Sequence, residues 1–125
     1  MKKQILTNNA PTPVGPYSQA VKAGNLLFVS GVLPINLETK KLEEDTSNAA
    51  KKIFEHLDAI LKEAGFERSN VIKSTIFMKN LGDFSKVNTI YAEYFNGIEV
   101  LPARSTIEVA GLPMGACVEM EFIIA

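Results

Sequence analysis

Two stretches near the end of the chain alternate between apolar and polar residues with a period of two. They run from Pro102 to Val109 and from Cys117 to Ile124, and a connection with two glycines and a proline separates them. Because this period places successive side chains on opposite faces of a strand, we expect two strands joined as a hairpin with a long loop. Such strands must pair with other strands in a sheet that is buried on one face, and this requirement limits the possible folds more than any other feature of the sequence.

The apolar residues of the two strands indicate which face of each is buried. In the second strand they are Val118, Met120, Phe122 and Ile124. In the first, Ser105, Ile107 and Val109 form the more apolar set. If both sets lie on one side of the sheet, Arg104 and Glu119 project together from the other side. An arginine can bind a carboxylate ligand and a glutamate can hold or activate a water, which is equipment for hydrolysing a small anionic substrate. The alternative is an exposed cross-strand salt bridge, since such pairs are common and weak.

The length and charge of the chain limit the classes of function that it can serve. The 125 residues are enough for one domain, which we expect to span residues 1–125. The net charge of −1 and the pI near 5.8 lack the basic excess that drives binding to phosphate backbones, so no nucleic-acid partner is expected.

The N-terminal segment and the cysteine count indicate the compartment. Met1-Lys2-Lys3 precedes a polar stretch with two prolines in place of the apolar run of a signal peptide, and no stretch approaches the roughly twenty apolar residues of a membrane helix. The single cysteine cannot form an internal disulfide. We therefore expect a cytoplasmic protein without a membrane partner.

The rest of the chain alternates between strand and helix patterns. The further strands expected are residues 3–6, 19–23, 26–29 and 71–79. One helix is expected from Asp45 or Thr46 to Gly65, and a second follows Asp83 and ends at Asn96-Gly97. The order β-β-β-α-β-α-β-β predicts an α+β fold, with both helices on one face of a single mixed β-sheet. The opposite face has no cover in the sequence, which predicts an oligomer whose sheets meet around an axis.

Several single residues are candidates for a ligand pocket. Tyr17 follows a proline-rich stretch and either caps a pocket or packs on the core. Ser30-Gly31 ends a strand, where glycine permits close approach of a ligand, although such a pair is usually only a strand terminator. Asn88 lies at the border of the buried stripe of the second helix, a position that is more often at the surface. His56 falls on the outer face of the first helix, and we expect it to be exposed.

The sequence contains no motif that indicates a nucleotide cofactor or a zinc site. Neither a Gly-x-Gly-x-x-Gly nor a Walker-type loop is present, and one histidine with one cysteine cannot form a zinc site of the usual nitrogen and sulfur type within a chain. A nucleophilic pair of Cys117 and His56 is disfavoured because they lie on a late strand and an outer helix face, and Cys117 is expected to be a packing or interface thiol. We therefore expect no cofactor and no metal.

Short motifs along nearly the whole chain resemble the RidA family, also called YjgF/YER057c/UK114. They are Gly15-Pro16-Tyr17-Ser18-Gln19, Ser30-Gly31-Val32-Leu33-Pro34, Glu63-Ala64-Gly65, Val87-Asn88, Pro102-Ala103-Arg104-Ser105, Glu108-Val109-Ala110, Leu112-Pro113 and Val118-Glu119-Met120-Glu121. The resemblance implies a chorismate-mutase-like fold and a homotrimer with ligand clefts between subunits. It also implies hydrolysis of 2-imino acids, such as 2-iminobutanoate and 2-iminopropanoate, to 2-oxo acids and ammonia, which protects pyridoxal-phosphate enzymes.

The resemblance also implies a role for each candidate. Arg104 would bind the substrate carboxylate, Glu119 would hold the attacking water, and Tyr17 would close the pocket. The remaining substrate-binding candidates are Ser30, Gly31, Asn88 and Thr106. Thr106 stands where the family frequently has cysteine, and Gly111 stands where a basic residue is common. The first departure excludes a cysteine nucleophile at position 106 but leaves the water mechanism intact.

Two other functions remain open from the sequence. One is a regulatory trimer that binds small carboxylates through Arg104 without turnover. The other is an endoribonuclease or translation inhibitor, a label that relatives often carry, against which the acidic pI weighs.

Overall fold

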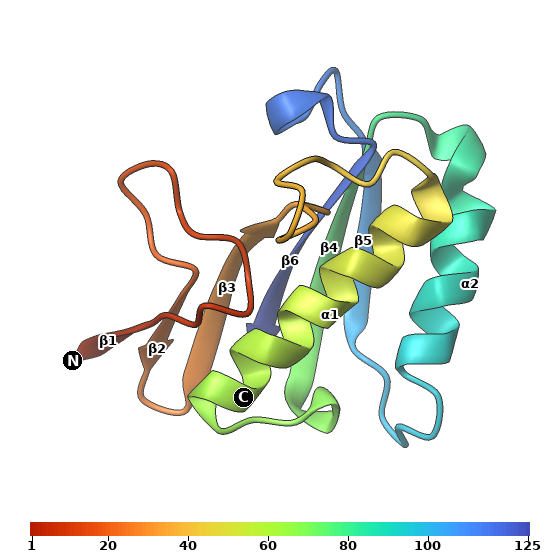
Figure 1. Ribbon diagram of the computed structural model, residues 1–125. Coiled ribbons are helices and arrows are strands. Elements are labelled where there is room, and N and C mark those ends of the chain that lie inside the picture. The colour runs from red at the N-terminus through yellow and green to blue at the C-terminus, as the bar shows by residue number, and fades with distance from the viewer.

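The computed structural model describes residues 1–125 and contains one six-stranded sheet with two helices (Figure 1). The strands are β1 (Lys2–Ile5), β2 (Ala20–Ala23), β3 (Leu26–Val32), β4 (Val71–Met78), β5 (Ala103–Glu108) and β6 (Val118–Ile124). The α-helices are α1 (Thr46–Ala64) and α2 (Phe84–Tyr94), and the short 3-10 helices are η1 (Arg68–Asn70), η2 (Leu81–Asp83) and η3 (Pro113–Gly115). No helix is both long and apolar enough to cross a membrane.

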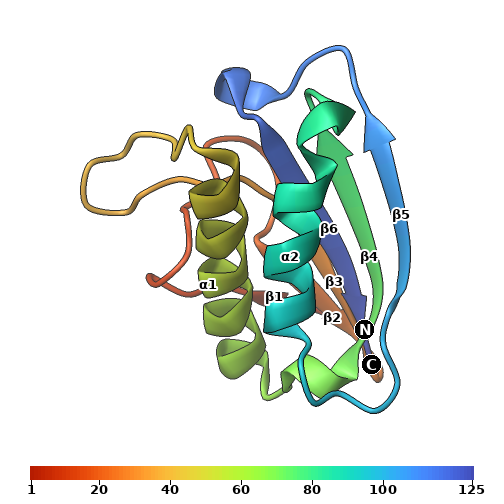
Figure 2. The same ribbon diagram turned by 90° about the vertical axis from the view of Figure 1, so that its right-hand side faces the viewer.

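The predicted α+β class and the order of elements are confirmed. The strands run in the order β1-β2-β3-β6-β4-β5, and all neighbours are antiparallel except β4 and β5, which are parallel. Both helices cover the same face of this mixed sheet (Figure 2). The other face, called the open face below, carries no helix.

The predicted hairpin of the last two strands is wrong, because β4 lies between β5 and β6. β5 returns from α2 and pairs in parallel with β4, so Arg104 lies beside Ser74. β6 pairs antiparallel with the other edge of β4, where Glu119 lies beside Phe77. Because Ser74 and Phe77 are three residues apart in one strand, their side chains point to opposite faces of the sheet.

Arg104 and Glu119 therefore lie on opposite faces of the sheet, which corrects the expectation that they project together. Arg104 faces α2, whereas Glu119 lies on the open face. The expectation failed because it assumed that the apolar residues of both strands face the same way. Ile107 of β5 instead lies beside Phe77 on the open face, where it is 47% exposed.

The helix ends largely follow their predicted signals. The Asp45 carboxylate accepts a hydrogen bond of 3.0 Å from the Asn48 amide at the start of α1, and Gly65 ends the helix at φ 79°, in the left-handed region that glycine tolerates. Asp83 precedes α2 as predicted, but its carboxylate makes no capping hydrogen bond and lies 3.4 Å from Lys86 Nζ instead.

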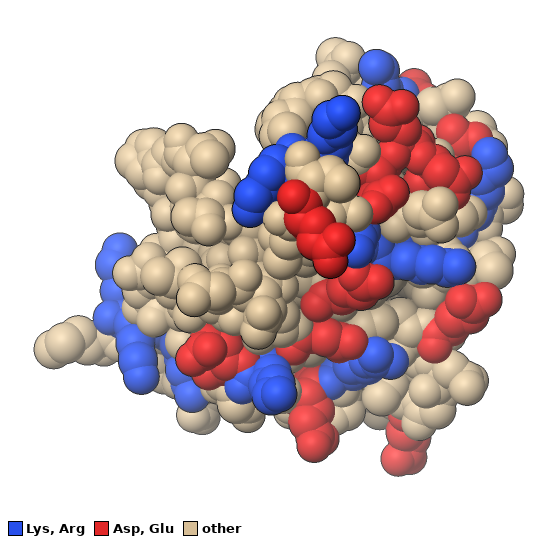
Figure 3. Space-filling view, viewed as in Figure 1, with Lys and Arg blue, Asp and Glu red and all other residues tan.

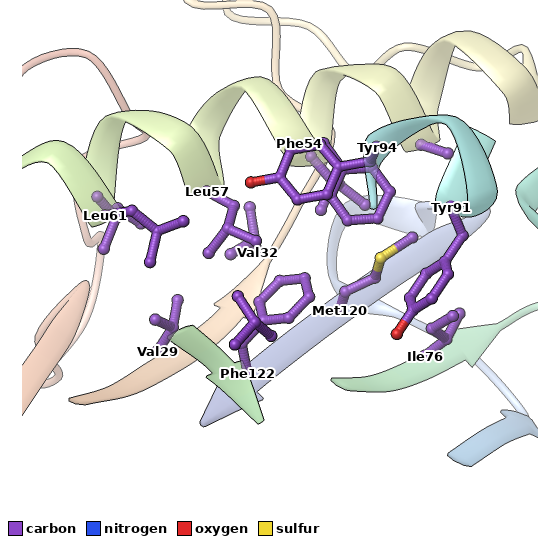
Figure 4. Packing of buried hydrophobic residues seen from close by; sticks show 14 of the residues in the cluster. Val29, Val32, Phe54, Leu57, Leu61, Ile76, Tyr91, Tyr94, Met120 and Phe122 are labelled. Carbon is purple, nitrogen blue, oxygen red and sulfur yellow. The ribbon is translucent and has the colours of Figure 1, made fainter. Parts of the chain in front are cut away.

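The core lies between the helices and the sheet (Figure 4). Phe54 of α1 stacks on Tyr94 of α2 with ring centroids 4.2 Å apart, and its ring also lies near Phe122 of β6. Tyr91 directs its hydroxyl towards the sheet, where it donates to the buried Ser74 Oγ at 3.0 Å. These contacts join α1, α2 and the central strands into one packed unit.

His56 is buried, with 2% of its surface exposed, so the prediction of an exposed histidine is wrong. Its Nε2 lies 2.8 Å from the carbonyl oxygen of Ile35, in the loop between β3 and α1. That loop covers the part of the helix surface that the helical pattern alone assigns to solvent. Burial lowers the pKa of the imidazole below its ordinary value.

Candidate functional site

A pocket with a volume of about 1020 Å³ lies at one end of the sheet and reaches its open face. Its walls come from the N-terminal segment Thr7–Ser18, called the arm below, from the end of β3 and the loop that follows it, and from η3 and the start of β6, with one residue each from α1 and β4. The arm projects from the body of the protein and carries no charged residue (Figures 1 and 3). We call this site the glutamate pocket, because it contains both Glu119 and Glu121.

Four of the predicted site residues line the glutamate pocket, namely Tyr17, Ser30, Gly31 and Glu119. They come from the arm, from β3 and from β6, because the pairing of β3 with β6 brings Ser30-Gly31 close to Glu119. The regular pairing of β3 with β6 is interrupted between Val29 and Val32, which is where Ser30 and Gly31 lie. Such an irregularity redirects side chains locally and is frequent next to functional sites.

Glu119 is half-buried, and burial, followed by the charge of Glu121, raises the pKa of its carboxyl group. Gly31 faces this carboxyl group directly. A Cβ at position 31 would lie 2.8 Å from the carboxyl carbon of Glu119. The glycine therefore provides the space that the Glu119 carboxylate occupies.

The hydroxyl of Ser30 bonds to the arm rather than facing the pocket freely. Ser30 Oγ donates to the carbonyl oxygen of Ser18 at 2.6 Å, and the Ser30 amide donates to the carbonyl of Gln19 at 3.0 Å. Tyr17, next to this junction, is 53% exposed, and its amide donates to the Gly15 carbonyl at 2.9 Å. Ser30 thus fixes the end of the arm beside the tyrosine.

Arg104 lies on the other side of the sheet, at its edge, against α2. Its Nη1 donates to Asn88 Oδ1 at 2.7 Å, and its guanidinium lies 4.8 Å from the ring centroid of Tyr91 and 5.2 Å from that of Phe84. These contacts hold the planar guanidinium while leaving several of its donors free. We call Arg104 and its three neighbours the arginine edge.

Phe84 and Tyr91 are the residues of the arginine edge that sequence reasoning missed as site residues. The helical pattern assigns them only to the buried stripe of α2. Their spacing does contain a signal, because positions 84, 88 and 91 recur at helical intervals on one side of α2. Recognising that signal requires knowing that β5 lies beside α2.

Within one chain the glutamate pocket and the arginine edge remain separate. Neither Arg104 nor Asn88 is among the residues that line the pocket. Thr106 pairs with Ile76 and lies on the same side as Arg104. The predicted site residues therefore form two groups, with Tyr17, Ser30, Gly31 and Glu119 in one and Asn88, Arg104 and Thr106 in the other.

The remaining ionisable groups do not form an additional reactive cluster. No group of three or more His, Cys, Asp or Glu side chains is placed to hold a metal ion. Cys117 is partly buried, and burial raises the pKa of its thiol, which favours the protonated, unreactive form.

Comparison with known proteins gives consistent matches along the chain. A family model described as Endoribonuclease L-PSP matches residues 7–125. Reactive Intermediate Deaminase A, chloroplastic, of Arabidopsis thaliana is 45% identical over 125 residues, which cover 98% of this chain and 66% of that protein.

Solved structures resemble this one closely. The crystal structure of YyfA from Yersinia pestis, a Rid-family protein of unknown function, has a TM-score of 0.96 and 44% sequence identity, covering 100% of this chain and 99% of that one. The structure of E. coli TdcF with bound serine has a TM-score of 0.93 and 35% identity, covering 98% of each chain.

Proposed function

Because this chain belongs to the RidA (YjgF) family, whose matching family model is described as Endoribonuclease L-PSP, we propose that it hydrolyses reactive 2-imino acids to 2-oxo acids and ammonia. The name of the Arabidopsis relative, a reactive intermediate deaminase, supports this activity. The serine bound to TdcF supports a ligand that carries an α-carboxylate.

The observation that carries the proposal is that the Arg104 guanidinium is already held in place with donors free to bind a carboxylate. Asn88 takes one donor of the guanidinium, and two aromatic rings hold its plane. Because this side chain is already ordered, it loses little conformational freedom when it binds a ligand. A charge-assisted hydrogen bond of this kind contributes about 1.5–3 kcal/mol.

Glu119 supplies the second requirement, a base that positions water. Burial and the nearby Glu121 raise the pKa of its carboxyl group, which makes the carboxylate a better proton acceptor than an exposed glutamate. In the proposed reaction a water adds to the imine carbon while Glu119 takes one of its protons. The carboxyl group then returns this proton to the nitrogen, which gives a carbinolamine. In a second transfer, Glu119 takes the proton of the new hydroxyl group and passes it to the nitrogen, so the C–N bond breaks as the C=O bond forms, and ammonia and the 2-oxo acid are released.

We propose that a second copy of the chain brings the arginine edge to the glutamate pocket, as in a homotrimer with clefts between subunits. The open face supports this assembly, because it has no helix above it and exposes Phe28 and Ile107 by 43% and 47%. The requirement for both groups in one reaction supports it independently.

The test is the rate of 2-oxobutanoate release while threonine dehydratase generates 2-iminobutanoate in the presence of a trapping amine. Wild type should accelerate release, and Arg104→Ala should abolish the acceleration at matched oligomeric state. Lys51→Ala, which removes one exposed positive charge on α1, serves as the control and should behave like wild type. Equal acceleration by Arg104→Ala would contradict the assignment of the site.

Glu119→Gln separates the enzyme from a carboxylate-binding regulator. An enzyme should lose rate and still bind 2-oxobutanoate, because Arg104 is intact. A regulator would keep its binding and would show no imine hydrolysis even as wild type. Incubation of wild type and Glu119→Gln with RNA tests the endoribonuclease activity named in the family description. RNA cleavage that survives in Glu119→Gln would indicate that it takes place at a different site.

A further inference from the structure

Gln19 directly follows the arm and ends the motif Gly15-Pro16-Tyr17-Ser18-Gln19, and the proposed reaction gives it no role. It is 5% exposed and directs its carboxamide back at the base of the arm. The Oε1 atom accepts from the Thr7 amide at 2.8 Å, and Nε2 approaches the carbonyl oxygens of Thr7, Ala10 and Pro11 at 3.0, 3.3 and 2.9 Å. One side chain therefore binds the first part of the arm through four contacts.

The backbone of Gln19 is itself fixed to the sheet. Its carbonyl accepts from the Ser30 amide, and β2 begins at the next residue, Ala20. The side chain thus ties the segment Thr7–Pro11 to a rigid strand and closes the arm into a loop. Within that loop the chain has only a few residues with which to reach Tyr17, and Pro13 and Pro16 stiffen them.

The position of Tyr17 consequently depends on this closure. Tyr17 is half exposed and belongs to the part of the loop that projects over the pocket. Its amide donates to the Gly15 carbonyl, and a Cβ at position 15 would lie 3.6 Å from its ring, so these contacts stay within the same loop. If the closure opened, Ser30 would still hold the carbonyl of Ser18 on one side of Tyr17, but the chain on the other side of Tyr17 would lose its attachment and the ring would gain freedom at the mouth of the glutamate pocket.

We infer that Gln19 is a positioning residue that closes the arm and thereby holds Tyr17 at the mouth of the glutamate pocket. The inference rests on the proposed function, because it gives the arm a role in binding the imino acid. It requires a carboxamide in particular. The site needs one acceptor and one group with two N–H donors on the same side chain, and a carboxamide offers both.

Gln19→Glu tests the inference with almost no change in volume. The glutamate keeps the acceptor for Thr7 but replaces the donor by an oxygen that faces three carbonyl oxygens. The matched control is Gln4→Glu, the same change at the only other glutamine, which is exposed in β1. Both variants add one negative charge. Because Gln19 itself lines the glutamate pocket, where a charge can act on the substrate directly, the Tyr17→Ala background and the fluorine resonance below assign the effect to the arm.

The first measurement is the steady-state kinetics of imine hydrolysis. We expect Gln19→Glu to raise KM roughly tenfold with kcat within about twofold of wild type, and Gln4→Glu to leave both unchanged. In a Tyr17→Ala background, Gln19→Glu should add less than about a twofold effect, because the residue acts through the tyrosine. A full additional loss in that background would overturn the inference.

The second measurement does not depend on activity. With 3-fluorotyrosine in place of the three tyrosines, the fluorine resonance of Tyr17 is assigned with Tyr17→Phe. We expect this resonance to shift or broaden in Gln19→Glu and to stay in place in Gln4→Glu. An unchanged resonance would overturn the inference even if the deaminase activity is real, and a shifted one would support it even if wild type hydrolyses no imine. A Gln19→Glu protein that unfolds entirely would also overturn it, since the residue would then support the core rather than the arm.

Discussion

Gly31 and Glu119 illustrate how one small residue sets the geometry of the pocket. The backbone of Gly31 is outside the left-handed region, so its conformation is open to any residue. What the position lacks is space, because a Cβ would lie 2.8 Å from the carboxyl carbon of Glu119. The glycine is thus explained by the carboxylate that faces it.

We expect Gly31→Ala to fold but to displace the Glu119 carboxylate. Since general-base catalysis contributes about 10²–10⁴-fold, partial misplacement should lower kcat/KM for the imine by roughly ten- to a hundredfold. The measurement is steady-state kinetics beside thermal unfolding. Gly111→Ala is the control, because a Cβ there meets nothing within 4 Å and the backbone is unstrained, and it should retain full activity. Wild-type kinetics in Gly31→Ala would show that Glu119 need not occupy its observed position.

Glu119→Gln should stabilise the fold while it removes activity. Burial raises the pKa of this carboxyl group above its unfolded value, so ionisation favours the unfolded chain as the pH rises through the folded pKa. At neutral pH the neutral glutamine avoids this penalty. Because the group is half exposed and screened by water, the gain should not exceed about 1 kcal/mol in the free energy of unfolding. Chemical denaturation at neutral pH checks it, with Glu93→Gln on α2 as a surface control; a less stable Glu119→Gln would contradict the argument.

His56 should make the fold sensitive to mild acid. Burial between α1 and the preceding loop lowers the pKa of its imidazole. The hydrogen bond to the Ile35 carbonyl opposes this shift in part, Lys52 lowers the pKa further, and Glu55 opposes it. The folded pKa lies below the unfolded one, so the stabilisation is complete above the unfolded pKa and is lost as the pH falls through the folded pKa. Between about pH 7 and about pH 5, wild type should lose more unfolding free energy than His56→Asn, measured by denaturation at each pH. Parallel losses in the two proteins would rule out His56 as the cause.

At the scale of the elements, a polar cluster joins the two helices at the surface of the core. Arg68 of η1 donates to both carboxylate oxygens of Asp58 on α1, at 3.1 and 2.8 Å, and to the carbonyl of Tyr94 on α2 at 3.1 Å. Its guanidinium also lies 4.1 Å from the centroid of the Tyr94 ring, whose hydroxyl donates to Asp58 at 2.6 Å. Arg68 therefore links η1, α1 and α2 through its hydrogen bonds.

Arg68→Ala should destabilise the fold by about 1–3 kcal/mol, because it leaves Asp58 without its positively charged partner and removes the stacking on Tyr94. Lys52→Ala breaks the exposed pair with Glu55, 2.8 Å apart within α1, and should cost about 0.5 kcal/mol or less. Urea denaturation of the two variants measures the contrast. Equal losses would mean that the cluster acts as an ordinary surface ion pair.

The elements also show how far the sequence determines this fold. The strand β6 and the helix α1 follow from local signals, since their faces and their caps lie within a few residues of one another. The partner of β5 does not, because β4 is far away in the sequence and takes the place that the predicted hairpin gives to β6. His56 was misassigned for the same reason, as the loop at Ile35 covers it from outside the helix.

In the candidate site, too, the residues marked by local motifs were predicted, whereas the features that depend on distant strand pairing were not. Short motifs identify Tyr17, Ser30, Gly31 and Glu119 as candidates, and the pairing of β3 with β6 explains why they share a pocket. The face of Arg104 depends on the register with β4, which periodicity cannot specify for an edge strand exposed on both sides. The contacts of Arg104 with Phe84 and Tyr91 could not be predicted either, because they also depend on where β5 lies in the sheet.

At the scale of the whole molecule, the separation of the two groups predicts complementation between inactive subunits. Arg104→Ala and Glu119→Gln should each be inactive alone. When they are unfolded together and refolded as a mixture, random assembly of a trimer should pair an intact arginine edge with an intact glutamate pocket at about a quarter of the sites. Recovery of about that fraction of activity, measured at equal total protein, supports sites shared between subunits. No recovery, with mixed trimers verified by mass spectrometry, would place both groups of one site in a single chain.

In the proposed assembly, the division of the site over two faces of the sheet would make the activity depend on contact between subunits. An isolated chain would then carry both groups of residues without bringing them together, so below the dissociation constant of the proposed assembly the rate should fall with the square or a higher power of protein concentration. A defective subunit would also silence a neighbour that is itself intact. Gene dosage, dilution and mixed alleles would therefore affect this protein more steeply than an enzyme whose catalytic residues share one chain.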